Sequence, residues 1–190
     1  LPGKIDGSAK YGSDVFVPNM VYGIPVQNPV RWGAVPQSVD ESAAKKIDGY
    51  VGAYVEKNGF ARINTGYVVA LGETIWAAMN AAKALKIDWD LGENKNVSSE
   101  DIRNESVKLQ QDPSKGFLWV LEGDTDDAMK NAATKHSAVY ETSIAYHGCH
   151  EPMNCTAYEK DGIWHLHGGN QWFSMAAPTA AAALGVEADK

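Results

Sequence analysis

The sequence has 190 residues, of which 44% are hydrophobic and 22% are charged, and its formal net charge is −7. This is the composition of a globular protein, and the acidic balance argues against nucleic acid or an anionic membrane as the main partner. No apolar run approaches the roughly 20 residues that a membrane-spanning helix needs, so no membrane span is expected. The chain begins at Leu1 without a visible signal peptide, which suggests a processed chain or a fragment.

Short strands and one long helix are predicted for the first ninety residues. β-Prone residues and turn signals place strands near 9–16, 20–27, 33–40, 50–55, 60–64, 67–71 and 86–90. Pro25 and Pro29 cannot donate a ladder hydrogen bond, so the strand at 20–27 is expected at a sheet edge or to stop early. Apolar residues at helical spacing predict a helix over 73–85, and a short helix is expected over 41–46 with Asp40 as its N-cap.

The second half becomes more polar from residue 91, where a domain boundary or a long connector is expected. A helix is predicted over 99–110, capped by Ser98 or Ser99, because carboxylates fill its first turn. Further elements are expected in the following order: a strand at 116–122, a helix at 124–133, a long alternating strand at 136–146 and a hairpin of strands 156–159 and 163–167. An Ala-rich helix follows over 174–184, beginning at about Pro178 and stopped by Gly185.

Two histidines, a carboxylate, two thiols and an amide fall within residues 147–158. A metal site built from His147, His150 and Cys155 is one reading, although the H-E-x-x-H arrangement is missing. A polar turn that satisfies its own backbone is the alternative. The C-x5-C spacing of the two cysteines matches no zinc finger, and it leaves a disulfide and free thiols both open.

The residues of this stretch, 147–158, also fit two further roles. A nucleophilic thiol at Cys149 or Cys155 has His147 as a nearby base, but the sequence places no third, orienting group. Glu151 precedes Pro152, which favours extended backbone. It can serve as a general base or as an acceptor that ties down a loop, and the structural role is favoured.

Gly168, Gly169, Asn170 and Gln171 follow the predicted hairpin and precede the last helix. They match neither a phosphate-binding loop nor a GxGxxG motif. An amide both donates and accepts hydrogen bonds, so Gln171 can face an oxo group, a thio group or the edge of a pterin. A turn with a surface glutamine is the alternative reading.

At these residues the sequence resembles the molybdenum hydroxylases (the xanthine dehydrogenase and aldehyde oxidase family). Residues 140–142 and 147–157 are similar to the run "YE…HxxMEPMNxxA", and Asn170-Gln171 stands at the later "TQ". Residues 4–20 resemble "KxdGxAxyg-D-xxxPgM", and residues 68–89 resemble "VAVVAdxxWaA…ALkvxWd". The order of these motifs is most similar to the large subunit of isoquinoline 1-oxidoreductase and of related aldehyde dehydrogenases.

The resemblance implies an α+β fold in three parts. Residues 1–92 would form an α/β hammerhead-like domain, residues 93–136 a connector with helices, and residues 137–190 the start of a molybdopterin-binding domain. Gln171, with Asn170 beside it, would belong to the cofactor pocket, and His150 and Glu151 would be pocket-adjacent or structural. His150 stands where the family usually has Met, so the environment of that loop is expected to differ.

The resemblance also implies that this chain is part of a larger enzyme. The family's glycine-rich "GGxFG" segment and its C-terminal catalytic Glu have no counterpart in these 190 residues. The chain alone is therefore expected to contain no catalytic residue, to bind no metal or cofactor and to be inactive. The complete enzyme would use molybdopterin, in its cytosine dinucleotide form, to hydroxylate an N-heterocycle or to oxidise an aldehyde with oxygen from water.

The expected partners are the remainder of the large subunit and an iron–sulfur small subunit, with a cytochrome as a further candidate. Two cysteines cannot supply a four-cysteine cluster site, so that machinery would lie outside this chain. The substrate would be a small aromatic compound or an aldehyde. The periplasm is the expected location, with the cytoplasm as the alternative. A non-catalytic binding or assembly module that retains the hammerhead fold is the second hypothesis for its function.

Overall fold

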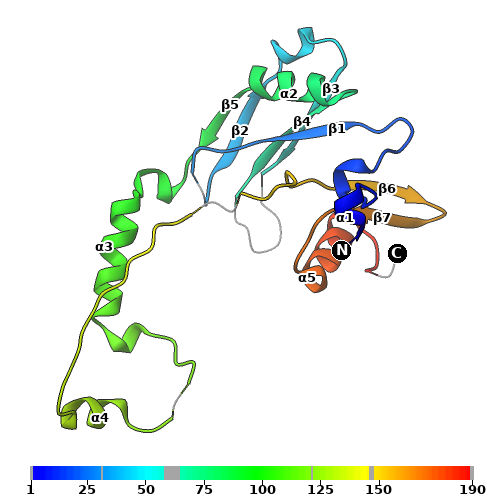
Figure 1. Ribbon diagram of the computed structural model, residues 1–190. Helices are drawn as coiled ribbons and strands as arrows, with labels where there is room; N and C mark the ends of the chain where they lie inside the picture. The colour runs from blue at the N-terminus through cyan, green and yellow to red at the C-terminus, as the bar shows by residue number, and fades with distance from the viewer. Residues whose placement is uncertain (1, 31, 58–64, 121, 146–147, 189–190) are drawn as a thin grey trace. The chain divides into compact units, whose positions relative to one another are not determined.

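The computed structural model describes residues 2–30, 32–57, 65–120, 122–145 and 148–188 (Figure 1). The chain divides into two compact units, which we describe separately. The first unit combines residues 1–95 with residues 149–190, and the second contains residues 96–148. The domain boundaries expected at residues 92 and 136 stay predictions.

Two small antiparallel sheets form the centre of the first unit. The first has the order β1-β4-β3, with β1 at Tyr22–Val26, β4 at Tyr67–Gly72 and β3 at Tyr50–Glu56. The second pairs β2 (Val35–Asp40) with β5 (Lys86–Asp90). Pro25 lies opposite Val69 in β1, an edge strand, as its missing N–H group predicts.

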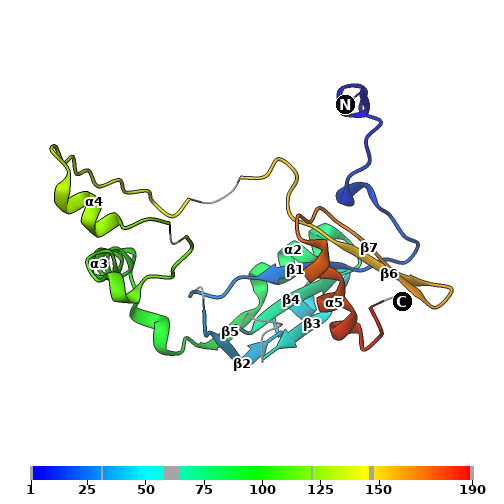
Figure 2. The same ribbon diagram turned by 90° about the horizontal axis from the view of Figure 1, so that it is seen from below.

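Helix α2 (Ile75–Ala84) packs on the β1-β4-β3 sheet against β4 and β1 (Figure 2). Thr74 caps the helix, because its hydroxyl oxygen accepts a hydrogen bond from the Ala77 N–H group at 3.1 Å. The residues buried between these elements are mostly small. They are Ala44, Val68, Ala70, Ala81 and Leu85. Small side chains let the helix approach the sheet closely, so this core depends on close contact more than on large side chains.

Gly72, the last residue of β4, marks the closest approach of α2. A Cβ atom placed on Gly72 would lie 2.5 Å from the Ala78 backbone nitrogen and 3.0 Å from the Ala77 Cβ. Neither atom can move without displacing the helix backbone or its packed face. The position therefore requires glycine for lack of space.

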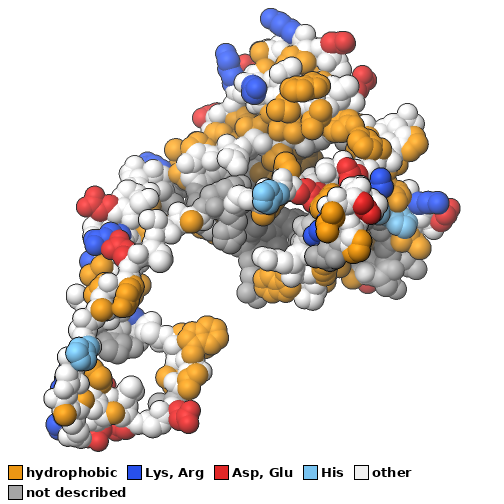
Figure 3. Space-filling view, viewed as in Figure 1, with side chains coloured by type: hydrophobic (Ala, Val, Ile, Leu, Met, Phe, Trp, Pro, Cys, Tyr) orange, Lys and Arg blue, Asp and Glu red, His pale blue; other side chains and the backbone are white. Residues whose placement is uncertain are grey.

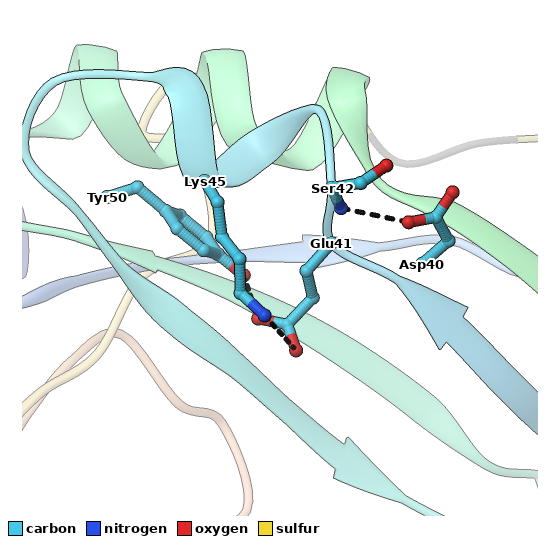
Figure 4. A network of polar contacts seen from close by, with 5 residues as sticks. All are labelled: Asp40, Glu41, Ser42, Lys45 and Tyr50. Atoms are coloured by element: carbon cyan, nitrogen blue, oxygen red, sulfur yellow. Dashed lines mark hydrogen bonds and ion pairs between the residues drawn. The ribbon is translucent and has the colours of Figure 1, made fainter.

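A neighbouring polar network fixes the turn that leads into β3 (Figure 4). The Tyr50 hydroxyl donates a hydrogen bond of 2.6 Å to Glu41 Oε2, and Lys45 Nζ lies 3.9 Å from Glu41 Oε1. Burial of the phenol and its hydrogen bond to the Glu41 carboxylate both raise the pKa of Tyr50. The carboxyl group of Asp40 accepts a hydrogen bond from the Ser42 N–H group at 2.9 Å. The segment is thus a tight turn followed by a short 3-10 helix (Ala44–Lys46). The short helix expected over 41–46 forms only in its second half, and its N-cap is Ala43 in place of the expected Asp40.

The remaining elements of the first unit are short or lie at its ends. They are helix α1 (Pro2–Asp6), a 3-10 helix η1 (Gly12–Asp14), the hairpin of β6 (Thr156–Lys160) and β7 (Ile163–His167), and helix α5 (Phe173–Leu184). Asp161 and Gly162 both have positive φ, as a two-residue type I′ hairpin turn requires. Helix α5 begins five residues before Pro178, so the expected start at that proline is wrong, and it ends at Gly185 in the left-handed conformation.

The second unit contains helix α3 (Ser99–Gln110), a 3-10 helix η4 (Pro113–Lys115) and helix α4 (Thr125–Asn131). A further 3-10 helix, η3 (Glu93–Asn96), leads into it. Ser98 caps α3 and Asp101 completes a capping box, as the sequence predicts. Among the described residues, no helix is long and apolar enough to cross a membrane.

Three predicted strands are not formed by the described residues. The segment 9–16 contains the turn at η1, because Asp14 accepts a hydrogen bond from the Tyr11 N–H group and bends the chain. Residues 116–120 and 136–145 have no strand partner in this structure. The strand predicted at 60–64 lies outside the described residues. The fold is a mixed α/β arrangement of small sheets, and its assignment as a hammerhead stays a prediction.

We expect Gly72→Ala to destabilise the chain by about 1–3 kcal/mol, because the added methyl group must push α2 away from β4. The matched control is Gly52→Ala in β3, where a Cβ atom would meet nothing within 4 Å. That control should be neutral or raise stability by up to about 1 kcal/mol. Urea unfolding followed by circular dichroism measures both variants. Equal stabilities for the two would contradict the close packing of α2.

Candidate functional site

The loop at 151–154 is hydrogen-bonded to the N-terminal segment of the first unit and leads directly into the β6–β7 hairpin. Glu151 Oε1 accepts hydrogen bonds from the Ser13 N–H group at 3.2 Å and from Asn154 Nδ2 at 2.8 Å. These bonds lower the pKa of Glu151, with the Asn154 amide as the main cause and the Ser13 N–H group next. In this structure Glu151 is an acceptor that joins two distant parts of the sequence.

Asn154 has a defined amide orientation. Its Nδ2 atom also donates to the Pro152 carbonyl at 2.8 Å, so both of its bonds require the nitrogen at that position. Its Oδ1 atom faces Gly12, and it is buried without a hydrogen-bond partner among the described residues. If the amide were reversed, its oxygen would face two acceptors, Glu151 Oε1 and the Pro152 carbonyl. The observed orientation keeps both Nδ2 hydrogen bonds and leaves Oδ1 without a partner among the described residues.

Two glycines allow these segments to meet. A Cβ atom on Gly12 would overlap Asn154 Oδ1 and lie 3.1 Å from the Gly168 Cα. A Cβ atom on Gly168 would lie 2.6 Å from the Asn154 carbonyl oxygen. We call this contact the Gly12–Asn154–Gly168 junction. A shallow hollow of about 390 Å³ lies beside it, and its walls include Lys10, Glu151 and His167.

Asn170 and Gln171 follow the junction at the start of α5. The Asn170 side-chain oxygen accepts a hydrogen bond from the Trp172 N–H group at 2.6 Å, which bends the chain into the helix. Gln171 is exposed in this bend, and its amide makes no hydrogen bond to the described residues. Gly169 has open space where a Cβ atom would lie. The Gln171 amide is therefore available to a ligand.

The structure does not bring all the predicted site residues together. His150 is exposed, Cys149 and Cys155 are free and exposed thiols, and His147 lies outside the described residues. Among the described residues, no group of three His, Cys, Asp or Glu side chains could hold a metal ion.

One cluster was missed by the sequence analysis. Tyr158 stacks on His165 and His167, with ring centroids 5.0 Å and 5.6 Å apart. Tyr158 pairs with His165 across the hairpin, and His167 lies two residues further along the same face. The predicted strand at 163–167 already placed His165 and His167 on one face, because residues two apart on a strand share a face. Their pairing with Tyr158 depends on the two-residue turn seen in the structure.

No family model matches the chain. A membrane-bound aldehyde dehydrogenase (pyrroloquinoline-quinone) of Gluconacetobacter polyoxogenes is 37% identical over 190 residues, and the match covers all of this chain and 24% of that protein. The isoquinoline 1-oxidoreductase subunit beta of Brevundimonas diminuta is 24% identical over 204 residues, again with all of this chain and 24% of that protein covered. The chain thus spans about a quarter of the length of the curated relatives it matches.

Two solved structures are also similar to part of the chain. Reconstituted CO dehydrogenase from Oligotropha carboxidovorans has a TM-score of 0.36 and 17% identity, and covers 46% of this chain and 14% of its own. A Cu,Mo-CO dehydrogenase in its carbon monoxide reduced state has a TM-score of 0.33 and 22% identity, with the same shares covered.

The two curated matches confirm the relationship predicted from the motifs. The chain is similar, over its whole length, to isoquinoline 1-oxidoreductase subunit beta and to an aldehyde dehydrogenase, the two kinds of protein that the motifs resemble most.

We expect Glu151→Ala to release the segment around Ser13 from the loop at 151–154. The Ser13 amide should exchange with solvent roughly tenfold faster, because it loses a hydrogen bond to a charged acceptor. Since the pKa of Glu151 is lowered in the folded state, its stabilising effect is present above the ordinary Glu pKa of roughly 4.3 and is lost as the pH falls. Hydrogen exchange followed by NMR measures this amide.

The control for this prediction is Glu159→Ala, which removes an exposed carboxylate from β6 in the same hairpin. It should leave exchange at Ser13 unchanged. If Glu151→Ala and Glu159→Ala gave the same exchange rate at Ser13, Glu151 would not hold the two segments together.

Proposed function

We propose that this chain is the N-terminal part of the large subunit of a molybdopterin-dependent oxidoreductase. Such an enzyme would hydroxylate an N-heterocycle or oxidise an aldehyde with oxygen from water. The observation that carries the proposal is the match of the whole chain, through the loop at 151–154 and the Gly-Gly-Asn-Gln run, to two proteins whose names denote oxidoreductases. Because the match covers 24% of each relative, the complete activity is a property of the longer protein.

The residues present fit one edge of a pterin cofactor. The Gln171 amide is exposed, and Gly169 before it has open space where a Cβ atom would lie, so a flat ligand can approach the backbone closely there. Asn170 has its oxygen occupied by the Trp172 N–H group, which leaves its Nδ2 group to donate. The Gly12–Asn154–Gly168 junction fixes the backbone that precedes this run.

The chain's own part in the reaction is therefore binding and orientation. Gln171 would donate to and accept from polar groups of the cofactor, and Asn170 would hold the bend that presents Gln171. The cofactor would supply the electron transfer. The cytosine dinucleotide form, an iron–sulfur small subunit, a cytochrome and a periplasmic location belong to the same proposal.

The name of one relative raises a specific alternative for the cofactor. That aldehyde dehydrogenase of Gluconacetobacter polyoxogenes is named for pyrroloquinoline quinone. Both cofactors are flat and polar, so a free amide beside two glycines does not distinguish them. The metal does distinguish them, because molybdenum is part of the molybdopterin cofactor.

We expect the native protein, captured from its own cells with an antibody to this chain, to contain close to one molybdenum atom per large polypeptide. Plasma mass spectrometry measures the metal, mass spectrometry of the denatured polypeptides measures their lengths, and chromatography of the extract measures the quinone. A lone chain of about this size without molybdenum would overturn the enzyme proposal and leave an assembly module. Stoichiometric quinone without molybdenum would overturn the cofactor assignment alone.

We expect Gln171→Ala in the full-length enzyme to weaken cofactor retention by about tenfold, the effect of one amide hydrogen bond or two. The matched control is Gln37→Ala, which removes an exposed glutamine from β2. Molybdenum per chain after gel filtration at low concentration measures retention independently of activity. Equal molybdenum contents for the two variants would remove Gln171 from the binding site.

A further inference from the structure

The described residues of the second unit form no hydrophobic core. None of them is buried, and Asp112 alone is half-buried. Twelve large hydrophobic side chains among these described residues are exposed between positions 97 and 145. The most exposed include Phe117, Trp119 and Tyr140, at 78%, 87% and 91%. Figure 3 shows such side chains along the part of the chain that carries α3 and α4.

Local interactions alone cannot keep this unit folded. A helix of 12 residues such as α3 is marginal in water without tertiary packing. Arg103 Nε lies 2.7 Å from Glu141 Oε1, but both side chains are more than half exposed, so this ion pair contributes about 1 kcal/mol at most. Ordering each residue costs about 1–2 kcal/mol of backbone entropy. The unit therefore needs burial that it does not supply itself.

Helix α3 has one apolar side available for such burial. Ile102 and Leu109 are seven residues apart, which places them on the same side of the helix. An open hollow of about 950 Å³ runs along α3, and its walls are α3 itself and Val97. One helix cannot enclose a cavity, and residues from both sides of α3 line this hollow, so it shows only that α3 is not covered by other described residues.

The run 136–145 lacks its partner in the same way. Its alternating sequence predicts a strand, yet the structure gives it no ladder, and Val139 and Ile144 are 75% and 71% exposed. A strand forms when another strand takes its backbone hydrogen bonds. The run 136–145, like α3, therefore lacks a packing partner among the described residues.

We propose that residues 97–145 are an interface, and that it is covered by the part of the same polypeptide that lies outside these 190 residues. Both curated relatives contain the segment, because each match covers all of this chain, and in each about three quarters of the polypeptide lies beyond the match. The segment leaves and re-enters the first unit at residues 95 and 149, as an insertion between packed elements does.

A membrane is the competing apolar occupant. Residues 96–148 carry nine Asp or Glu and five Lys or Arg residues. This excess of negative charge opposes an anionic lipid surface, which attracts basic segments. The charge therefore favours a protein surface over a membrane.

Site-specific photo-crosslinking in the full-length protein tests this interface. A benzophenone amino acid replaces Ile102 on the apolar side of α3, and the control replaces Asn104, which lies on the opposite side of the helix. We expect a strong adduct from position 102 and little from position 104. The product should migrate as a single polypeptide, and its joined peptide should come from outside residues 1–190.

The other products would overturn the proposal. A product of twice the mass would indicate a second copy, a product with another subunit would indicate that subunit, and a lipid adduct would indicate a membrane. Joining to a peptide within residues 1–190, or equal adducts at the two positions, would overturn it as well.

A second measurement needs no substitution and so cannot fail through misfolding. In the wild-type full-length protein, the amides of α3 should exchange on the order of 100-fold or more slowly than unstructured amides, because buried helices open rarely. Exchange at the unprotected rate would overturn the proposal.

The inference depends on one part of the proposed function, namely that this chain belongs to a longer subunit. Neither readout involves molybdenum, so full molybdenum with an unprotected α3 would overturn the interface alone.

Discussion

The structure of the first unit depends on the close approach of α2 to β4. Gly72 has no room for a Cβ atom beside Ala77 and Ala78, and the buried positions around it are held by alanine and valine. A core of small side chains buries little apolar area per residue but gives many close backbone contacts. Such a core therefore tolerates little additional side-chain volume. The sheet, the turn at Glu41 and Tyr50, and the strand β5 all pack around this contact.

The candidate site is positioned by a different kind of interaction. The Gly-Gly-Asn-Gln run takes its place from Glu151, Asn154 and two glycines, which join the N-terminal segment to the hairpin by polar contacts. A carboxylate with acceptor capacity on both oxygens can hold two donors from distant segments at once. A residue that is a catalytic candidate because its side chain is chemically reactive can therefore serve instead to orient a loop. Glu151 is the example here, since its bonds are to a backbone N–H group and to a neighbouring amide.

Local patterns could predict much of this fold. The Lys160-Asp161-Gly162 turn, the Ser98 cap and the Ala-rich helix α2 are set by residues close together in sequence, and each forms as expected. The errors occurred where the local signal was ambiguous. At 9–16 the β-prone residues are overridden by the side chain of Asp14. At 41–46 the Asp40 carboxylate accepts from the Ser42 N–H group in a turn, so the short helix begins only at Ala44. The Gly12–Asn154–Gly168 junction joins residues more than 140 positions apart, and no local pattern could reveal it.

The strand predicted at 136–146 differs from these errors in its physical origin. Its alternation is that of a strand with two distinct faces, yet the described part of the run forms neither a strand nor a helix. Sequence pattern reports the structure that a segment adopts when its partners are present. Where a strong pattern lies in a unit without a core, the two observations together indicate that the partner belongs to another part of the assembly. By the same reasoning Gln171, with its amide at a fixed bend, would under the proposed function form one wall of a site whose other walls lie outside these 190 residues.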